Sequence, residues 1–170
     1  MLSLALGPPL ALSGCGWAPL YGEAESGPAS EELRAIHVDP IPERIGQRLE
    51  IALRNSLNPT GEPTPERYRL RTTLSTSLGN LGIESQGLAS LGKLDVYATY
   101  TLIDSKSHKT LVTNTVHVAN SFDLNPNQYS TVVGENDTAV RSAAELDQEI
   151  VTRLALFIER RLAEQPAAPS

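Results

Sequence analysis

The sequence predicts an α+β fold, a two-layer sandwich in which a sheet of about four strands carries two helices packed on one face. Residues 66–78 and 93–104 alternate between apolar and polar side chains, and two other segments repeat apolar side chains at helical steps of three and four. The predicted order is strand, helix, three strands, helix. Because each helix has one apolar stripe, both helices bury it most simply against the one apolar face of a sheet.

The first strand and the first helix are short segments separated by proline. Residues 33–39 alternate loosely and end at Pro40, which cannot continue a ladder of strand hydrogen bonds. Pro42 and Glu43 then open a helix, because the first helical turn tolerates proline and favours an acid. Asn58-Pro59 and Gly61 end it. Its apolar stripe is Ile45, Leu49, Ala52, Leu53 and Leu57.

Three strands follow, connected by turns. Residues 66–78 place Tyr68, Leu70, Thr72, Leu74, Thr76 and Leu78 on one face. Gly79, Gly82, Gly87 and Gly92 predict irregular or bulged pairing between residues 83 and 91. A third strand covers residues 93–104, the polar segment 104–109 predicts a hairpin turn, and a fourth strand covers residues 110–122.

The last predicted element is a long amphipathic helix that starts between residues 130 and 135 and ends at residue 163. Its stripe is Ala139, Ala143, Leu146, Ile150, Leu154, Phe157, Ile158 and Leu162. The 170 residues therefore form one domain, residues 33–163. Residues 15–32 are interpreted as a lipidated N-terminus and flexible tether, and the Pro- and Ala-rich residues 164–170 as a disordered tail.

The only cysteine lies at the end of a lipoprotein cleavage motif. Leu12-Ser13-Gly14-Cys15 follows an apolar leader, and processing at this motif removes residues 1–14 and attaches lipid to the sulfur of Cys15. The apolar stretch of residues 2–12 is shorter than the roughly 20 residues that cross a bilayer as a helix. Gly16 replaces the Asp that many lipoproteins use for retention in the inner membrane, so we expect an outer-membrane destination.

Candidate chemistry is sparse. A net charge of −6 without a basic cluster argues against nucleic acid. His37, His108 and His117 lie on different predicted elements, so no metal site and no cofactor are expected. No nucleophile elbow or phosphate loop is present, and we expect no enzyme activity.

The polar feature of most interest is a row of arginines on one strand. Arg67, Arg69 and Arg71 are spaced by two, which points three guanidinium groups to one side. Guanidinium groups match phosphate or carboxylate, so the row is a candidate contact for an anionic lipid or an acidic protein surface, and Lys93 is a candidate addition. An ordinary solubilising surface is the alternative.

These features resemble the lipopolysaccharide-assembly lipoprotein family LptE. The resemblance covers the order of elements, the start Cys15-Gly16-Trp17 with Pro19-Leu20-Tyr21-Gly22, and the final helical segment 129–162. It also includes the patterns Ile45-Gly46-x-x-Leu49 and Arg54-Asn55-x-Leu57.

The resemblance implies a protein anchored at the periplasmic face of the outer membrane. In that family the protein sits as a plug in the β-barrel LptD, and the pair delivers lipopolysaccharide to the cell surface. A lipoprotein that binds a lipid or phospholipid in transit without a barrel partner is the alternative function. An anchored hydrolase is a third, for which the sequence offers no nucleophile with a base.

Overall fold

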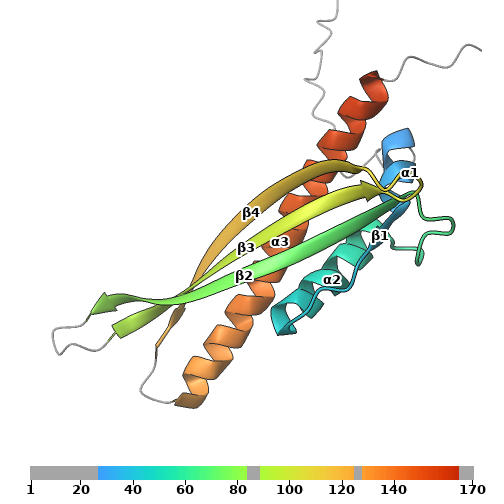
Figure 1. The fold of residues 1–170 in the computed structure, drawn as a ribbon. Helices are drawn as coiled ribbons and strands as arrows, with labels where there is room; N and C mark the ends of the chain where they lie inside the picture. The colour runs from blue at the N-terminus through green and yellow to red at the C-terminus, as the bar shows by residue number, and fades with distance from the viewer. Residues whose placement is uncertain (1–26, 84–88, 125–127, 165–170) are drawn as a thin grey trace, which may run out of the picture.

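The computed structural model describes residues 27–83, 89–124 and 128–164, which form one four-stranded sheet and three helices (Figure 1). The strands lie in the order β1-β2-β3-β4, with bounds β1 Ile36–Val38, β2 Tyr68–Ile83, β3 Ala89–Asp104 and β4 Thr110–Asp123. The helices are α1 Pro28–Arg34, α2 Arg44–Leu57 and α3 Gln128–Glu164. The predicted α+β sandwich is confirmed, and α1 is a third helix in addition to the two that were predicted.

The strand connections explain the topology. Strands β2, β3 and β4 are antiparallel neighbours, whereas β1 is parallel to β2. Parallel neighbours need a crossover connection, and α2 supplies it. At the predicted turn between β3 and β4, the Asp104 carboxylate accepts hydrogen bonds from the backbone N–H groups of Ser107 and Lys106, at 2.7 and 3.1 Å. These bonds hold the pKa of Asp104 below its usual range and close the hairpin.

The core lies between the sheet and the two long helices, α2 and α3, which run behind the sheet in Figure 1. From α2 it takes Ile45, Leu49, Leu53 and Leu57, and from α3 Ala143, Leu146, Ile150, Leu154 and Ile158. The sheet contributes Ile36, Val38, Leu70, Leu94, Val96, Ala98, Tyr100, Leu102 and Val116. Both predicted apolar stripes therefore face the sheet, on the same side.

The β2–β3 hairpin is longer and more regular than expected. Pairing stays in register from Tyr68–Asp104 to Ile83–Ala89, and a register shift lies between β3 and β4 at Leu102/Ile103. Residues 84–88 of the predicted irregular stretch lie outside the described residues. Gly92 is compatible with this strand because the ring of its cross-strand partner Phe122 covers it. A Cβ at residue 92 would lie 2.3 Å from the tip of that ring. Gly92 is therefore a packing position, whereas we had expected it to mark irregular or bulged pairing.

The folded region begins earlier than predicted. Helix α1 occupies Pro28–Arg34, where we expected the end of a tether and the start of a strand, and only Ile36–Val38 form β1. Pro28 at the first position and Glu31 in the first turn suit a helix start. Ala29 and Leu33 pack against the core, which provides the burial that a helix this short needs. At the other end, Glu164 belongs to α3, and residues 165–170 of the predicted tail lie outside the described residues.

Asn58, the C-cap residue of α2, connects the α1–β1 segment to the rest of the sandwich. Its buried side-chain amide donates hydrogen bonds to the backbone carbonyls of Arg34 and Ile36, both at 3.0 Å. We expect Asn58→Ala to lower the free energy of unfolding by about 1–3 kcal/mol, because two carbonyls lose their donor. Urea unfolding followed by circular dichroism measures this, with the exposed Asn55→Ala as the matched control. Equal midpoints for the two variants would contradict the role of Asn58.

Candidate functional site

The candidate site is the sheet face that α2 and α3 leave uncovered, called here the outer face (Figure 1). Odd-numbered residues from Arg71 to Gly79 of β2, from Lys93 to Thr101 of β3 and from Thr113 to Ser121 of β4 point to it, because side chains alternate along a strand. Cross-strand register groups them into rows. From one end of the sheet to the other these are Arg71-Thr101-Thr113, Thr73-Thr99-Thr115, Ser75-Tyr97-His117, Ser77-Asp95-Ala119 and Gly79-Lys93-Ser121.

Threonines occupy most of the first two rows of the outer face, at the same end as Arg71. The hydroxyl groups of Thr99 and Thr115 are hydrogen-bonded at 2.9 Å, and those of Thr101 and Thr113 at 3.1 Å. Thr73 donates to the Thr99 carbonyl at 3.4 Å. A β-branched residue with a hydroxyl group suits a strand whose side chains meet water or another polar surface.

The predicted arginines gather at one end of the sheet, each beside a carboxylate. The Asp39 carboxylate lies between Arg69 and Arg71, with both Nε–Oδ distances 3.5 Å. Arg69 also contacts Glu66 at 3.3 Å, and Arg67 pairs with Glu32 of α1. The three positive charges are therefore matched by three negative ones. Each contact is monodentate and each guanidinium group is exposed, so the pairs are weak and the arginines stay accessible to a phosphate or carboxylate ligand.

Lys93 is not part of this cluster. It lies opposite Gly79, eight residues along β2 from Arg71, which corresponds to roughly 26 Å at about 3.3 Å per residue. There it contacts Asp95 at 2.9 Å, and His117 reaches the same carboxylate at 2.9 Å. Hydrogen bonds from Lys93 and His117 hold the pKa of Asp95 below its usual range. The His117 ring also stacks on Tyr97, with centroids 4.2 Å apart.

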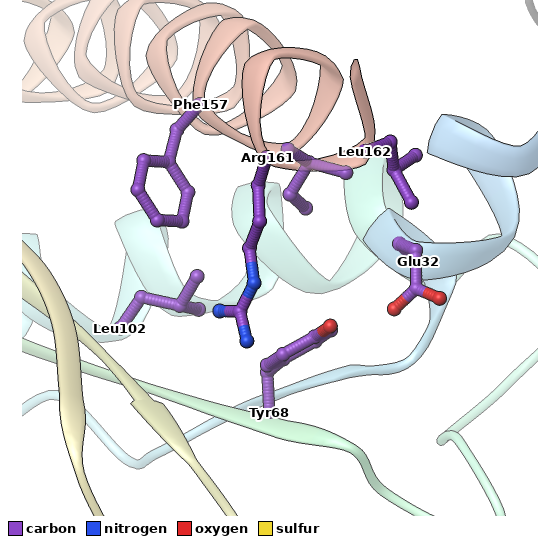
Figure 2. A pocket seen from close by; sticks show the side chains of 7 residues that line it. Glu32, Tyr68, Leu102, Phe157, Arg161 and Leu162 are labelled. Atoms are coloured by element: carbon purple, nitrogen blue, oxygen red, sulfur yellow. The ribbon is translucent and has the colours of Figure 1, made fainter. Parts of the chain in front are cut away.

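A small cavity separates the sheet from the end of α3. Figure 2 shows the Arg161 guanidinium group pointing down from α3 toward Tyr68, with Glu32 beside the hydroxyl end of the ring. The Arg161 Cζ lies 5.9 Å from the Tyr68 ring centroid, a cation–π contact. Burial and the nearby Glu32 carboxylate raise the pKa of Tyr68. At about 30 Å³ the cavity is the size of one water molecule, so this contact serves packing.

Asp147 is the buried carboxylate between α2 and α3. Its side chain is 8 % exposed, and its Oδ2 accepts a hydrogen bond from the Ser56 hydroxyl at 2.7 Å. Burial raises the pKa of Asp147, and the Ser56 hydrogen bond only partly offsets this. The Oδ1 atom has no hydrogen-bond partner.

The raised pKa of Asp147 predicts a pH dependence of stability. The folded state binds this proton more tightly than the unfolded state, so the contribution is favourable at low pH and is lost as pH rises through the folded-state pKa. We therefore expect Asp147→Asn to change the free energy of unfolding more favourably at pH 7 than at pH 4. Urea titrations at both pH values measure the difference, with the exposed Asp137→Asn as control. A more favourable effect at pH 4 would contradict the prediction.

Two further observations limit the chemistry of the described residues. Within residues 27–83, 89–124 and 128–164, no three His, Cys, Asp or Glu side chains gather as metal ligands. No helix in these same ranges is long and apolar enough to span a membrane. Cys15 and the motif of residues 12–14 lie outside the described residues, as does the predicted leader.

Helices cover one side of the sheet and polar side chains line the other, which defines an α+β two-layer sandwich with one polar sheet face. The model of the lipopolysaccharide-assembly family LptE matches residues 33–154. The chain belongs to this family, as its sequence features suggested. Membership of this family indicates that the protein takes part in lipopolysaccharide assembly.

Solved structures show the same fold. A candidate lipoprotein of Caulobacter crescentus CB15 is 21 % identical, with a TM-score of 0.64, 83 % of this chain covered and 100 % of that one. A minor lipoprotein of Acinetobacter baumannii is 16 % identical, with a TM-score of 0.58 and coverages of 71 % and 90 %. Lipoprotein B of Nitrosomonas europaea is 12 % identical, with a TM-score of 0.57 and coverages of 79 % and 90 %. No curated protein matches the sequence.

Proposed function

We propose that this chain is a lipid-anchored, non-enzymatic component of lipopolysaccharide assembly at the periplasmic face of the outer membrane, with the β-barrel LptD as its partner. The observation that carries the proposal is the family match over residues 33–154. The cleavage motif ending at Cys15 supports the lipid anchor. The similar folds that are themselves named lipoproteins agree with it.

The outer face supports a role inside a barrel. The interior of a membrane β-barrel is polar, so a plug needs a polar surface toward it. Rows of Thr and Ser with scattered charges meet this need without burying an unpaired charge, since Arg69, Arg71 and Lys93 each have a carboxylate neighbour. Binding and positioning require no covalent chemistry.

Co-purification tests the partner. We expect the tagged full-length protein, extracted from membranes in mild detergent, to bring down a stoichiometric outer-membrane β-barrel protein. A monomer with bound lipid would favour the alternative function, a lipid carrier without a barrel. Esterase turnover or bound metal in the purified protein would revive the anchored hydrolase.

The arginine row is the proposed contact for lipopolysaccharide phosphates. We expect Arg69→Glu with Arg71→Glu to weaken lipopolysaccharide binding in a pull-down at least about tenfold, since one hydrogen bond to a charged group contributes about 1.5–3 kcal/mol. Circular dichroism should stay unchanged, because both side chains lie on the surface.

Two controls distinguish the loss of the arginine site from a general effect of the changed net charge. The double variant Arg44→Glu with Arg160→Glu changes net charge equally at exposed helical positions and should bind normally. The neutral variant Arg69→Gln with Arg71→Gln avoids new repulsion with Asp39 and should still lose affinity. Undiminished binding by both row variants would remove the arginines from the proposal.

A further inference from the structure

An apolar groove lies between α1, the end of α2 and the last third of α3, on the side of the molecule away from the outer face. It encloses about 560 Å³. Helix α3 lines one wall with Val151, Thr152, Ala155, Leu156, Glu159 and Leu162, and α1 lines the other with Pro28, Ala29, Ser30, Leu33 and Arg34. Leu57 forms part of the lining, is almost fully buried and belongs to the core. Leu156 remains 43 % exposed, so the groove holds apolar surface that the described residues do not cover.

The groove opens where the undescribed N-terminal segment joins the fold. Gly27, the first described residue, is itself part of the lining. The preceding residues 22–26 are small or acidic, whereas residues 17–21 are Trp-Ala-Pro-Leu-Tyr, an uncharged apolar block. Tyr21 lies six residues before Gly27, which allows a reach of about 20 Å. The block can therefore enter the groove without any rearrangement of the domain.

The dimensions of the block and the groove agree. The lining of α3 extends from Val151 to Leu162, twelve residues and about 17 Å of helix. Five extended residues, 17–21, span about 17 Å. We propose that residues Trp17–Tyr21 dock in this groove, so that the N-terminal segment folds back onto α1 and α3. A tethered segment has a high local concentration, so moderate apolar burial is enough to keep it bound.

One competing occupant, the C-terminal tail, fits less well. Residues 165–170 leave the end of α3 nearby, but Gln-Pro-Ala-Ala-Pro-Ser offers little apolar surface to bury. The proposal goes beyond the proposed function and does not depend on it. If Cys15 carries lipid, docking at Trp17 also fixes which end of the sandwich faces the membrane, because only Gly16 separates the two residues.

Trp17 reports docking directly, since it is the only tryptophan of the chain. The experiment uses the chain from residue 15 with Cys15→Ser in detergent-free buffer, because every described element and the whole core lie within residues 27–164. We expect blue-shifted Trp17 emission and a several-fold lower iodide quenching constant than in Leu20→Asp. Leu156→Asp should expose Trp17 equally, whereas Val140→Asp, at a similarly exposed position of α3, should not.

Several outcomes would overturn the proposal. Trp17 as accessible in the parent chain as in Leu20→Asp means that the block is not docked. If Trp17 stays protected from iodide in Leu156→Asp but not in Leu20→Asp, the block is docked outside this groove. Protection that rises with protein concentration indicates a second copy in the groove. Protection that appears only after deletion of residues 165–170 indicates that the tail is the occupant.

Discussion

Leu154→Ala is expected to lower the free energy of unfolding by about 3–5 kcal/mol, a large fraction of the stability of a domain this size. Leu154 is 0 % exposed and belongs to the core between α3 and the sheet. Truncation removes buried methyl groups and leaves a cavity that a rigid sheet cannot close. Leucine and alanine have similar helix propensities, so the loss reports packing and not the helix itself.

Urea unfolding at neutral pH measures this loss, with Val140→Ala as the matched control on the same helix. Val140 is 49 % exposed, so its truncation should change stability by no more than about 0.5 kcal/mol. If the two variants had equal midpoints, the end of α3 near Leu154 would not be packed on the sheet as described.

The stripes of α2 and α3 were predictable because they are long and strongly periodic, and burial selects that period. Helix α1 was not, because its residues Pro28–Ser30 have the small, polar composition of a linker, and it is its packing on α3 that orders it. The parallel position of β1 also escaped prediction. A strand of three residues is too short for its sequence to indicate which strand it pairs with. The crossover through α2 places β1 parallel to β2.

The candidate site was predictable one strand at a time. Alternation put Arg69 and Arg71 on one side of β2, but Asp39, which shares its carboxylate between them, comes from the segment after β1. The cluster of Lys93, Asp95, Tyr97 and His117 depends on the register of β3 with β4. The sequence alone does not show which residues face each other across two strands. The contacts of His117 with Asp95 and Tyr97 were therefore not predictable.

The proposed anchor predicts the largest functional effect. Each buried methylene of an acyl chain contributes about 0.8 kcal/mol, and one chain alone gives reversible binding, so a cysteine with several chains stays in the membrane. We expect the parent protein, with Cys15 in place, to remain in the membrane pellet after a high-salt wash. The Cys15→Ser variant should move almost completely to the soluble fraction. The variant should unfold at the same urea concentration, because the core lies within residues 36–158.

Ala18→Ser is the matched control, since it adds the same hydroxyl group three residues away and should leave the protein in the pellet. Mass spectrometry of the cell-derived protein provides the independent test. It should show a chain that starts at Cys15 and carries the added mass of acyl groups. An intact leader with a free thiol, or a Cys15→Ser variant that stays in the pellet, would contradict the lipid anchor while leaving the family and the fold unaffected.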